Sequence, residues 1–310
     1  MDLNSKQLAD LIRGMRSAYA RGENAMAFAR EALEANCVVG RNQQLATLIA
    51  YDLQAGTYVE GARAHPEENQ RWCRQIADLI APVFPKGGSL LEVGVGEATT
   101  LAGVLAKLGG GRAFGFDISW SRIRVANNWL LEQSQSANLF VADLLNIPFA
   151  DNSIDVVYSS HSLEPNGGWE EEAIAECLRV ARRALVLIEP LYELASPEAQ
   201  ARMRHHGYVR GLRDTAKRLG AEVVDYRLLE HTGNSLNPSG VLSLLKLASA
   251  DTQLISPLID EIWQCPLTGA RLWKDGEGFV AQDQGLVYPV LQRVPLLRPE
   301  HAVVASNFYD

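Results

Sequence analysis

From residue 89 onward, short apolar runs alternate with segments of helix length, and this alternation constrains the fold more than any other feature of the sequence. Several runs are apolar throughout, as in strands that are buried on both faces of a parallel sheet. Helical crossovers between such strands predict an α/β fold with a doubly wound open sheet, whose carboxyl edge binds ligands. The expected strands are 90–93, 113–116, 139–141, 156–159 and 185–189, and the expected helices are 98–108, 120–133 and 170–181.

Two further runs, 222–228 and 240–247, also have the character of strands. About a dozen residues separate them, which is too few for another helical crossover, so we expect an antiparallel pair at one end of the sheet. The prediction is therefore a seven-stranded, mostly parallel sheet rather than the six-stranded sheet of a dinucleotide-binding fold.

Three regions are expected along the chain. Residues 1–85 are predicted to form a helical cap, because apolar residues recur there at helical spacing until prolines and glycines end the pattern. Residues 86–250 form the core that carries the sheet. Residues 251–310 contain five prolines and short apolar runs such as 278–281 and 285–290, which predict a small β-rich domain.

Composition excludes several classes of protein. Of the 310 residues, 47% are hydrophobic and 21% are charged, and no apolar stretch approaches the roughly 18 residues of a membrane-spanning helix. The N-terminus shows no secretory signal and the four cysteines are widely spaced, so we expect a cytoplasmic protein without a disulfide framework.

The net charge of −8 argues against broad binding to nucleic acid or membranes. The sequence contains no P-loop and no nucleophile elbow, which argues against an NTPase and a serine hydrolase.

The first motif is a glycine-rich turn between the first expected strand and the helix after it. Gly94 and Gly96 allow a tight turn and let a ligand approach the backbone, while the start of the helix offers unpaired N–H groups. Thr99 departs from the dinucleotide fingerprint, and the acidic Glu92 would repel a pyrophosphate. Glu92 suits a ligand with an ammonium or a sulfonium group.

Two more acids follow strand tips. Asp117 ends the second expected strand, where a carboxylate can accept hydrogen bonds from both hydroxyls of a ribose. Asp143 follows the third strand, where it can accept from an adenine amino group. The repeated relation of strand tip and acid predicts a nucleoside site.

Residues 89–248 resemble the class I S-adenosylmethionine-dependent methyltransferases, and 141–164 resembles the branch that contains the ubiquinone- and menaquinone-biosynthesis enzymes. The resemblance implies that the turn holds the methionine part of the cofactor, that the second strand tip holds the ribose and that the third holds the adenine. The family usually has a third glycine where this chain has Ala98, and we expect a slightly shifted turn. The implied cofactor residues are Glu92, Gly94, Gly96, Asp117, Ile118, Asp143, Leu144 and Ser159, with Tyr51 and Tyr58 from an N-terminal segment that packs over the cofactor.

Several of these residues have alternative interpretations. Tyr51 and Tyr58 could instead pack in the core with hydrogen-bonded hydroxyls. His161 and Glu164 follow the fourth strand and could supply a catalytic base, or they could be a loop histidine bonded to the backbone and a solvated glutamate. The candidate substrate contacts are Glu189 and Tyr192, after the fifth strand, and His205, which could instead form an exposed surface pair with the histidine beside it.

The C-terminal region carries a second resemblance. Residues 263–272, 285–290 and 294–297 resemble the small zinc-ribbon-like subunits that activate RNA and release-factor methyltransferases. Those subunits often carry a CPxC motif, but Thr268 stands at the second cysteine position after Cys265. One thiolate cannot form a four-ligand zinc site, so we expect a module without metal that serves packing, a homodimer or a protein partner.

Together these observations predict an enzyme that moves a methyl group from S-adenosylmethionine to a small or medium-sized acceptor such as a metabolite, sugar or lipid precursor. In-line alignment of acceptor and methyl can supply most of the acceleration, so a dedicated base is optional. The alternatives are a methyltransferase that acts on RNA or protein, a regulatory protein or scaffold that binds the cofactor without transfer, and a nicotinamide oxidoreductase. Glu92 and Thr99 argue against the last of these.

Overall fold

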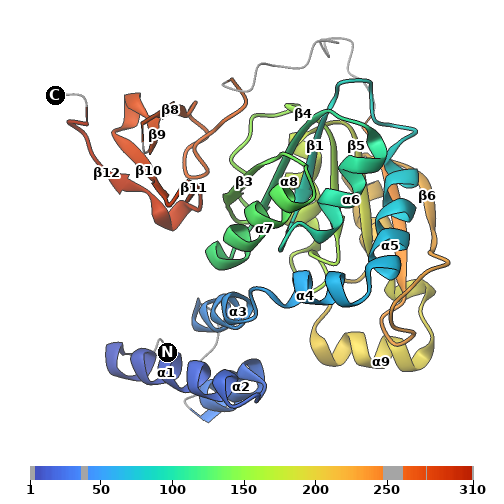
Figure 1. Ribbon diagram of the computed structural model, residues 1–310, viewed down its shortest axis with the longest axis horizontal. Coiled ribbons are helices and arrows are strands. Elements are labelled where there is room, and N and C mark those ends of the chain that lie inside the picture. The colour runs from blue at the N-terminus through green and yellow to red at the C-terminus, as the bar shows by residue number, and fades with distance from the viewer. Residues whose placement is uncertain (1–3, 36–40, 247–260, 277, 309–310) are drawn as a thin grey trace.

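The computed structural model describes residues 4–35, 41–246, 261–276 and 278–308 and contains the predicted seven-stranded sheet (Figure 1). Its strand order is β3-β2-β1-β4-β5-β7-β6. The first five strands run parallel to their neighbours, and β7 pairs antiparallel with both β5 and β6. The predicted antiparallel pair at the end of the sheet is confirmed. The strands are β1 (Ser89–Val93), β2 (Arg112–Asp117), β3 (Asn138–Val141), β4 (Ile154–Ser160), β5 (Ala181–Pro190), β6 (Glu222–Leu228) and β7 (Ser239–Leu245).

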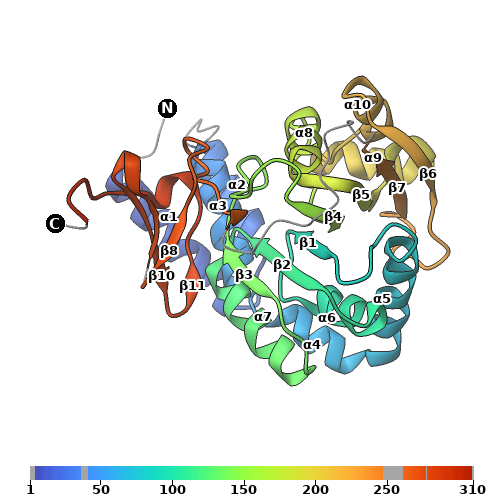
Figure 2. The same cartoon turned by 90° about the horizontal axis from the view of Figure 1, so that it is seen from above.

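Helices cover both faces of this sheet, as its apolar strands require (Figure 2). On one face, α5 (Pro66–Ile80), α6 (Thr99–Leu108) and α7 (Trp120–Glu132) contribute to one buried apolar cluster. On the other face, α8 (Glu170–Val180) and α10 (Leu212–Arg218) contribute to a second cluster. The chain leaves β5 through the short helix η1 (Tyr192–Leu194) and α9 (Pro197–His206) before it reaches α10.

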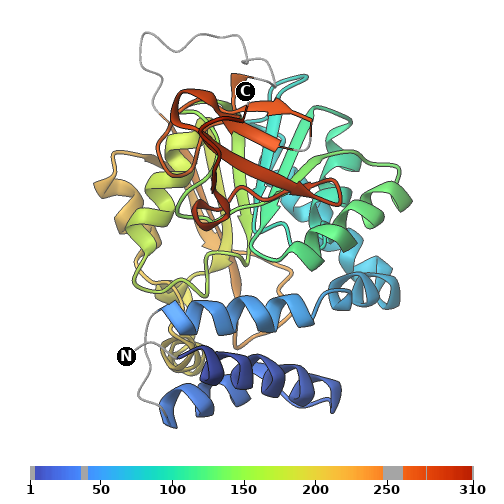
Figure 3. The same cartoon turned by 90° about the vertical axis from the view of Figure 1, so that its left-hand side faces the viewer.

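The N-terminal region is helical, as predicted, but its helices pack in two places. Helices α1 (Ser5–Ala20), α2 (Ala25–Ala35) and α3 (Arg41–Leu53) share a small apolar cluster of their own. Figure 3 shows α3 lying across one edge of the sheet, with α1 and α2 beyond it. Helix α4 (Thr57–Ala64) continues from α3, and α5 belongs to the helical layer on the sheet. Cys37 lies outside the described residues.

The C-terminal residues form a small antiparallel sheet, which includes the strands expected at 278–281 and 285–290. Trp263 inserts into the core beside Phe149 and Phe140, with ring centroids 4.7 Å and 5.2 Å away. Buried Cys265 lies 3.2 Å from the hydroxyl of Tyr288. The expected boundary at residues 250 and 251 falls outside the described residues. The elements are β8 (Trp273–Asp275), β9 (Gly278–Ala281), η3 (Gln282–Gln284), β10 (Leu286–Leu291), β11 (Val294–Pro295), η4 (Pro299–His301) and β12 (Val303–Val304).

This C-terminal sheet is joined to the edge of the large sheet. Leu296 forms a parallel bridge with Val141 of β3, and the backbone N–H of Leu297 donates to the carbonyl of Val141 at 2.7 Å. On α7, the indole of Trp120 donates to the carbonyl of Leu291. The backbone just after β11 therefore pairs with the carboxyl end of the edge strand β3. Within the described residues, no helix is both long enough and apolar enough to cross a bilayer.

Candidate functional site

A cavity of about 1370 Å³ lies at the carboxyl edge of the parallel strands. Its floor is the glycine-rich turn and the tips of β2 and β3, and its walls are the loops 160–169 and 230–239. Helices α3, α4 and α5 line it from the N-terminal side, and Arg298 reaches it from the C-terminal module. This is the edge at which open α/β sheets bind ligands.

The glycine-rich turn needs its glycines. Gly94 and Gly96 have φ angles of 64° and 54°, in the left-handed region that residues with a Cβ rarely adopt. A Cβ on Gly94 would lie 2.2 Å from that of Ser162. Ala98 shares this conformation with a φ of 57° and is fully buried, so the backbone at the family's third glycine is still that of a glycine.

Glu92 lies behind the turn and is not among the residues that line the cavity. Its side chain is 2% exposed, and its carboxyl group accepts a hydrogen bond from the hydroxyl of Tyr158 at 2.7 Å. Burial raises the pKa of the Glu92 carboxyl to about 8, although the hydrogen bond from Tyr158 opposes this shift. The structure gives Glu92 a buried hydrogen bond and no contact with the cavity.

The two acids at strand tips do line the cavity. Asp117 accepts hydrogen bonds from the backbone N–H groups of Gly96 at 3.1 Å and Ser119 at 2.9 Å, and Ile118 lines the wall beside it. Burial raises the pKa of the Asp117 carboxyl, against the effect of these hydrogen bonds. Asp143 accepts from the N–H of Leu145 at 2.9 Å, and Asp143 and Leu144 line the cavity as well. The sheet topology thus brings the tips of β2 and β3 and the glycine-rich turn after β1 to the same cavity.

Ser159 and Glu189 are not among the residues that line the cavity. Their side chains are buried and form a hydrogen bond with each other. The Ser159 hydroxyl donates to the Glu189 carboxylate at 2.7 Å, and both side chains are fully buried. The same carboxylate accepts the backbone N–H groups of Ser162, Leu163 and Glu164 at 3.0–3.1 Å. Burial raises the pKa of Glu189 to about 7. Glu189 therefore holds the loop after β4 in shape, and Ser160, one position further along, reaches the cavity.

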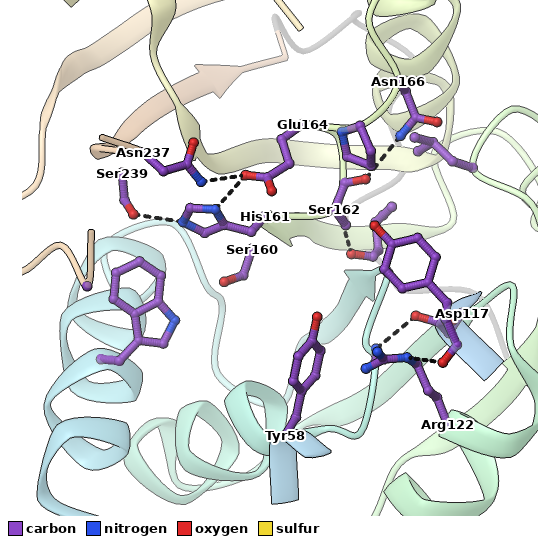
Figure 4. A pocket seen from close by; sticks show the side chains of 18 of the residues that line it. Tyr58, Asp117, Arg122, Ser160, His161, Ser162, Glu164, Asn166, Asn237 and Ser239 are labelled. Atoms are coloured by element: carbon purple, nitrogen blue, oxygen red, sulfur yellow. Dashed lines mark hydrogen bonds and ion pairs between the residues drawn. The ribbon is translucent and has the colours of Figure 1, made fainter. Parts of the chain in front are cut away.

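His161 and Glu164 form a bonded pair in the cavity wall (Figure 4). Nδ1 of His161 lies 2.7 Å from Oε2 of Glu164, and Nε2 lies 2.7 Å from the hydroxyl of Ser239. Asn237 donates to the same carboxylate oxygen at 3.1 Å. The His161 ring is thus bonded to side chains, and the Glu164 side chain is largely buried. The alternative interpretation, a histidine ring bonded to the backbone beside a solvated glutamate, does not describe this pair.

Two further properties of His161 bear on its role. Its φ of 57° is rare for a residue with a side chain, and such conformations concentrate at functional sites. Burial lowers the pKa of its imidazole, but the hydrogen bond that the ring donates to Glu164 and the charges of Glu164 and Glu189 outweigh burial, so the net pKa is raised. The raised pKa means that the neighbouring carboxylates favour the protonated form of the ring.

The other two candidate substrate contacts lie away from the cavity. The Tyr192 hydroxyl accepts a hydrogen bond from Arg204 at 2.5 Å, and His205 is exposed on α9 with its ring 5.2 Å from that of His206. Neither residue lines the cavity. The chain turns outward after β5, and the loop that enters the antiparallel strand β7 forms the wall instead.

Tyr51 and Tyr58 both line the cavity, and they enclose a residue that sequence reasoning missed. The guanidinium carbon of Arg122 lies 4.2 Å from the centre of the Tyr58 ring and 5.5 Å from that of Tyr51. Its Nε donates to the carbonyl of Tyr51 at 3.0 Å. Burial raises the pKa of the Tyr51 hydroxyl to about 12. Arg122 is only 1% exposed and belongs to no motif, so no pattern in the sequence marks it.

Glu97 is a second residue that was missed, although an acid inside a glycine-rich turn was a visible signal. Its buried carboxylate accepts the backbone N–H groups of Gly56 at 2.9 Å and Val59 at 2.8 Å, at the start of α4. It also lies 3.4 Å from Nη1 of Arg122. Asp52 of α3 makes a similar connection, since it accepts hydrogen bonds from the hydroxyl groups of Ser119 and Ser121. These two carboxylates fasten the N-terminal helices over the cavity.

Comparison with known proteins agrees with this geometry. Residues 90–185 match a family model described as a methyltransferase domain, and no curated protein matches the sequence significantly. The chain is similar in structure to magnesium protoporphyrin IX methyltransferase from Synechocystis PCC 6803, with a TM-score of 0.51 and 13% identity over 65% of this chain and 100% of that one. It is also similar to a chain of the complex between the Haloferax volcanii Trm112 methyltransferase activator and a methyltransferase, with a TM-score of 0.50 and 16% identity over 63% and 96%.

At these identities the structural likeness shows the fold, and the family model independently marks the segment from β1 into β5. The seven-stranded sheet with its reversed last strand is the fold that the sequence predicted. Residues 90–185 are therefore similar to a methyltransferase domain, and the chain has the fold of the solved methyltransferase that it resembles.

Proposed function

We propose that this protein transfers a methyl group from S-adenosylmethionine to a small or medium-sized polar acceptor. The observation that carries the proposal is the convergence of the glycine-rich turn, Asp117 and Asp143 on one cavity. The Synechocystis methyltransferase with this fold was solved with S-adenosylhomocysteine bound, which supports the same cofactor here. The cavity of about 1370 Å³ exceeds the roughly 300–1000 Å³ of a pocket for one drug-sized ligand, so it has room for a cofactor and an acceptor.

In this proposal the cofactor lies along the strand tips. Asp117 and Ile118 take the ribose, Asp143 and Leu144 take the adenine, and the methionine part lies at the turn. Glu92 stays behind the turn and supports Tyr158. Arg298 lines the cavity beyond β3, so we infer that the C-terminal module helps to enclose the adenine end, as an activator joined to the same chain.

The transfer step is an in-line displacement. A lone pair of the acceptor forms a bond to the methyl carbon, the bond from that carbon to sulfur breaks, and the cofactor leaves as a neutral thioether. Alignment of the two reactants supplies most of the acceleration. For an acceptor that must lose a proton, the Ser239 hydroxyl passes its proton to Nε2 of neutral His161 and takes up that of the acceptor, and Glu164 at Nδ1 stabilises the resulting imidazolium.

The walls around this pair favour a polar acceptor. Trp72 lies 5.9 Å from the ring of His161, and Asn69, Asn234 and His231 line the same cavity. Aromatic faces and hydrogen-bonding groups in a concave site suit a small polar molecule. The net charge of −8 gives no support to an RNA acceptor. A scaffold that only binds the cofactor would have its acceptor space filled, whereas Tyr51 and Tyr58 leave the cavity open.

Calorimetric titration tests the proposal. S-adenosylmethionine and S-adenosylhomocysteine should bind, and NAD should not. The variants Asp117→Asn and Asp143→Asn should each weaken binding by about tenfold or more, because each loses a charged acceptor worth about 1.5–3 kcal/mol. The matched control Asp283→Asn, an exposed change in the C-terminal module, should bind as the wild type does. If both Asp117→Asn and Asp143→Asn bind the cofactor as tightly as the wild type, the assignment of the site is refuted. If the protein binds the cofactor but methylates no member of a panel of metabolites, the result favours the scaffold.

A further inference from the structure

Asn237 uses its side-chain amide in one direction only. Its Nδ2 donates a hydrogen bond to Oε2 of Glu164 at 3.1 Å, whereas its Oδ1 is buried and has no hydrogen-bond partner among the described residues. Leaving a buried carbonyl unpaired costs free energy, and each such group in a folded protein calls for an explanation. The hydrogen bond to Glu164 is therefore kept although it leaves the other end of the amide unsatisfied.

The same oxygen of Glu164 meets the ring of His161. Oε2 lies 2.7 Å from Nδ1 of His161, so it accepts one hydrogen bond from the ring and one from Asn237 (Figure 4). A carboxylate only accepts hydrogen bonds, so Nδ1 must carry a proton. In the neutral ring Nε2 is then bare, and it accepts a hydrogen bond from the hydroxyl of Ser239 at 2.7 Å. The position of the Glu164 carboxylate thus decides which nitrogen of His161 is free to take a further proton.

The backbone of Glu164 is fixed without help from Asn237. Its N–H donates to the carboxylate of Glu189 at 3.0 Å, and its carbonyl accepts a backbone N–H at 3.0 Å. Neither hydrogen bond restrains the rotation of the Glu164 side chain. The side chains that act on its carboxylate are those of His161, Asn237 and Tyr208. Because Asn237 and the ring share one oxygen, the amide holds that oxygen at Nδ1.

The chain that enters β7 holds Asn237 and Ser239 in a stiff relation. Buried Pro238 lies between them, and its ring fixes its own φ and restricts the backbone of the residue before it. The loop is also tied to α5, where the side chain of Gln75 exchanges two hydrogen bonds with the backbone of His231. Asn237 and Ser239 therefore reach opposite ends of the bonded pair, one at the carboxylate and the other at Nε2 of the ring.

We propose that Asn237 is a positioning residue that fixes the tautomer of His161 by holding Glu164 against Nδ1. Its consequence for methyl transfer rests on the proposed function, because this tautomer keeps Nε2 free for the proton that Ser239 passes on. Asn237 moves no proton and acts through the carboxylate. Because Asn237 also lines the cavity, a direct contact with the acceptor is the other use of its amide, and the experiment separates the two.

Nitrogen-15 NMR of protein labelled in its histidines measures the tautomer, because the two nitrogens of a neutral ring differ in chemical shift according to which one carries the proton. The spectrum is recorded at a pH high enough for a neutral ring, and the His161 signals are identified by their loss in His161→Gln. The wild type should carry the proton on Nδ1. Asn237→Leu and the smaller Asn237→Ala should each lower the ratio of the Nδ1–H to the Nε2–H form by about tenfold, the effect of losing a hydrogen bond to a charged group. The control Asn128→Ala, an exposed change on α7, should leave the ratio unchanged.

A double variant shows whether Asn237 acts through the carboxylate. Glu164→Gln should itself lower the tautomer ratio, because a neutral amide is a weaker acceptor, and adding Asn237→Ala should then change the ratio by less than about twofold. An undiminished effect of Asn237→Ala in this background would overturn the proposal.

An unchanged tautomer in both single variants of Asn237, or a wild-type ring with its proton on Nε2, would overturn it as well. A raised KM for an acceptor without a change of tautomer would also overturn it and would assign Asn237 to the acceptor. The NMR measurement needs no ligand, so a protein that fails to bind S-adenosylmethionine would refute the proposed function while the tautomer is still measured, which is a distinguishable result.

Discussion

Replacing Glu92 by glutamine should change how the stability of the protein depends on pH. Burial raises the pKa of the Glu92 carboxyl from 4.5 to about 8, so the folded protein keeps the proton at a pH where the unfolded chain has lost it. The folded state binds more protons than the unfolded state between these two values. The contribution of Glu92 to the free energy of unfolding must therefore fall as the pH rises from 4.5 to about 8, and it stays constant above that.

The size of this effect follows from the linkage relation. Each pH unit inside the window costs the wild type about 1.4 kcal/mol, so the change from pH 5 to pH 7 amounts to about 3 kcal/mol. Glutamine cannot ionise and can still accept the hydrogen bond from Tyr158. Glu92→Gln should therefore match the wild type near pH 5 and exceed its stability by about 3 kcal/mol at pH 7.

Urea-induced unfolding followed by circular dichroism at pH 5, 6, 7 and 8 measures this difference. All other ionisable groups are common to both proteins, so the difference between the two curves isolates Glu92. The control Glu222→Gln changes an exposed carboxylate on β6 and should give a difference near zero at every pH. A pH-independent difference between Glu92→Gln and the wild type would show that Glu92 is ionised in the folded protein and would refute the reasoning.

Two further predictions concern the loop after β4 and the N-terminal helices. The rate of methyl transfer to an acceptor that loses a proton should rise with pH through a pKa above 6.5, because His161 must be neutral to act as a base and its pKa is raised. Glu164→Gln should move this rise in rate to lower pH, because it removes the charge that raises the pKa of His161. A rate that does not depend on pH would exclude His161 as the base. Glu97→Ala should speed amide hydrogen exchange at Gly56 and Val59 by about 10- to 100-fold, because both N–H groups lose their acceptor. Unchanged exchange at these amides would show that water replaces the carboxylate at no cost.

The fold was predictable because its signals are local. Apolar runs, their spacing and the short gap before the last strand each determine one element or one pairing, and the structure confirms the seven-stranded sheet with its antiparallel end. The glycine-rich turn and the acids Asp117 and Asp143 were also visible, because strand tips of a parallel sheet meet at one edge.

The remaining site residues depend on information that sequence spacing lacks. Adjacent residues of a strand point to opposite sides, so a shift of one position separates Ser159, which bonds to Glu189, from Ser160, which lines the cavity. Tyr192 was misplaced because the direction in which the chain leaves β5 is set by tertiary packing. Arg122 became visible only through its burial between two tyrosines.

The cavity has walls from segments far apart in the sequence, with Tyr51 on one side and Arg298 on another. Contacts of such long range form late in folding, since the intervening chain must first be ordered. During synthesis this side of the cavity would thus remain open to solvent until the C-terminal module has emerged and paired with β3.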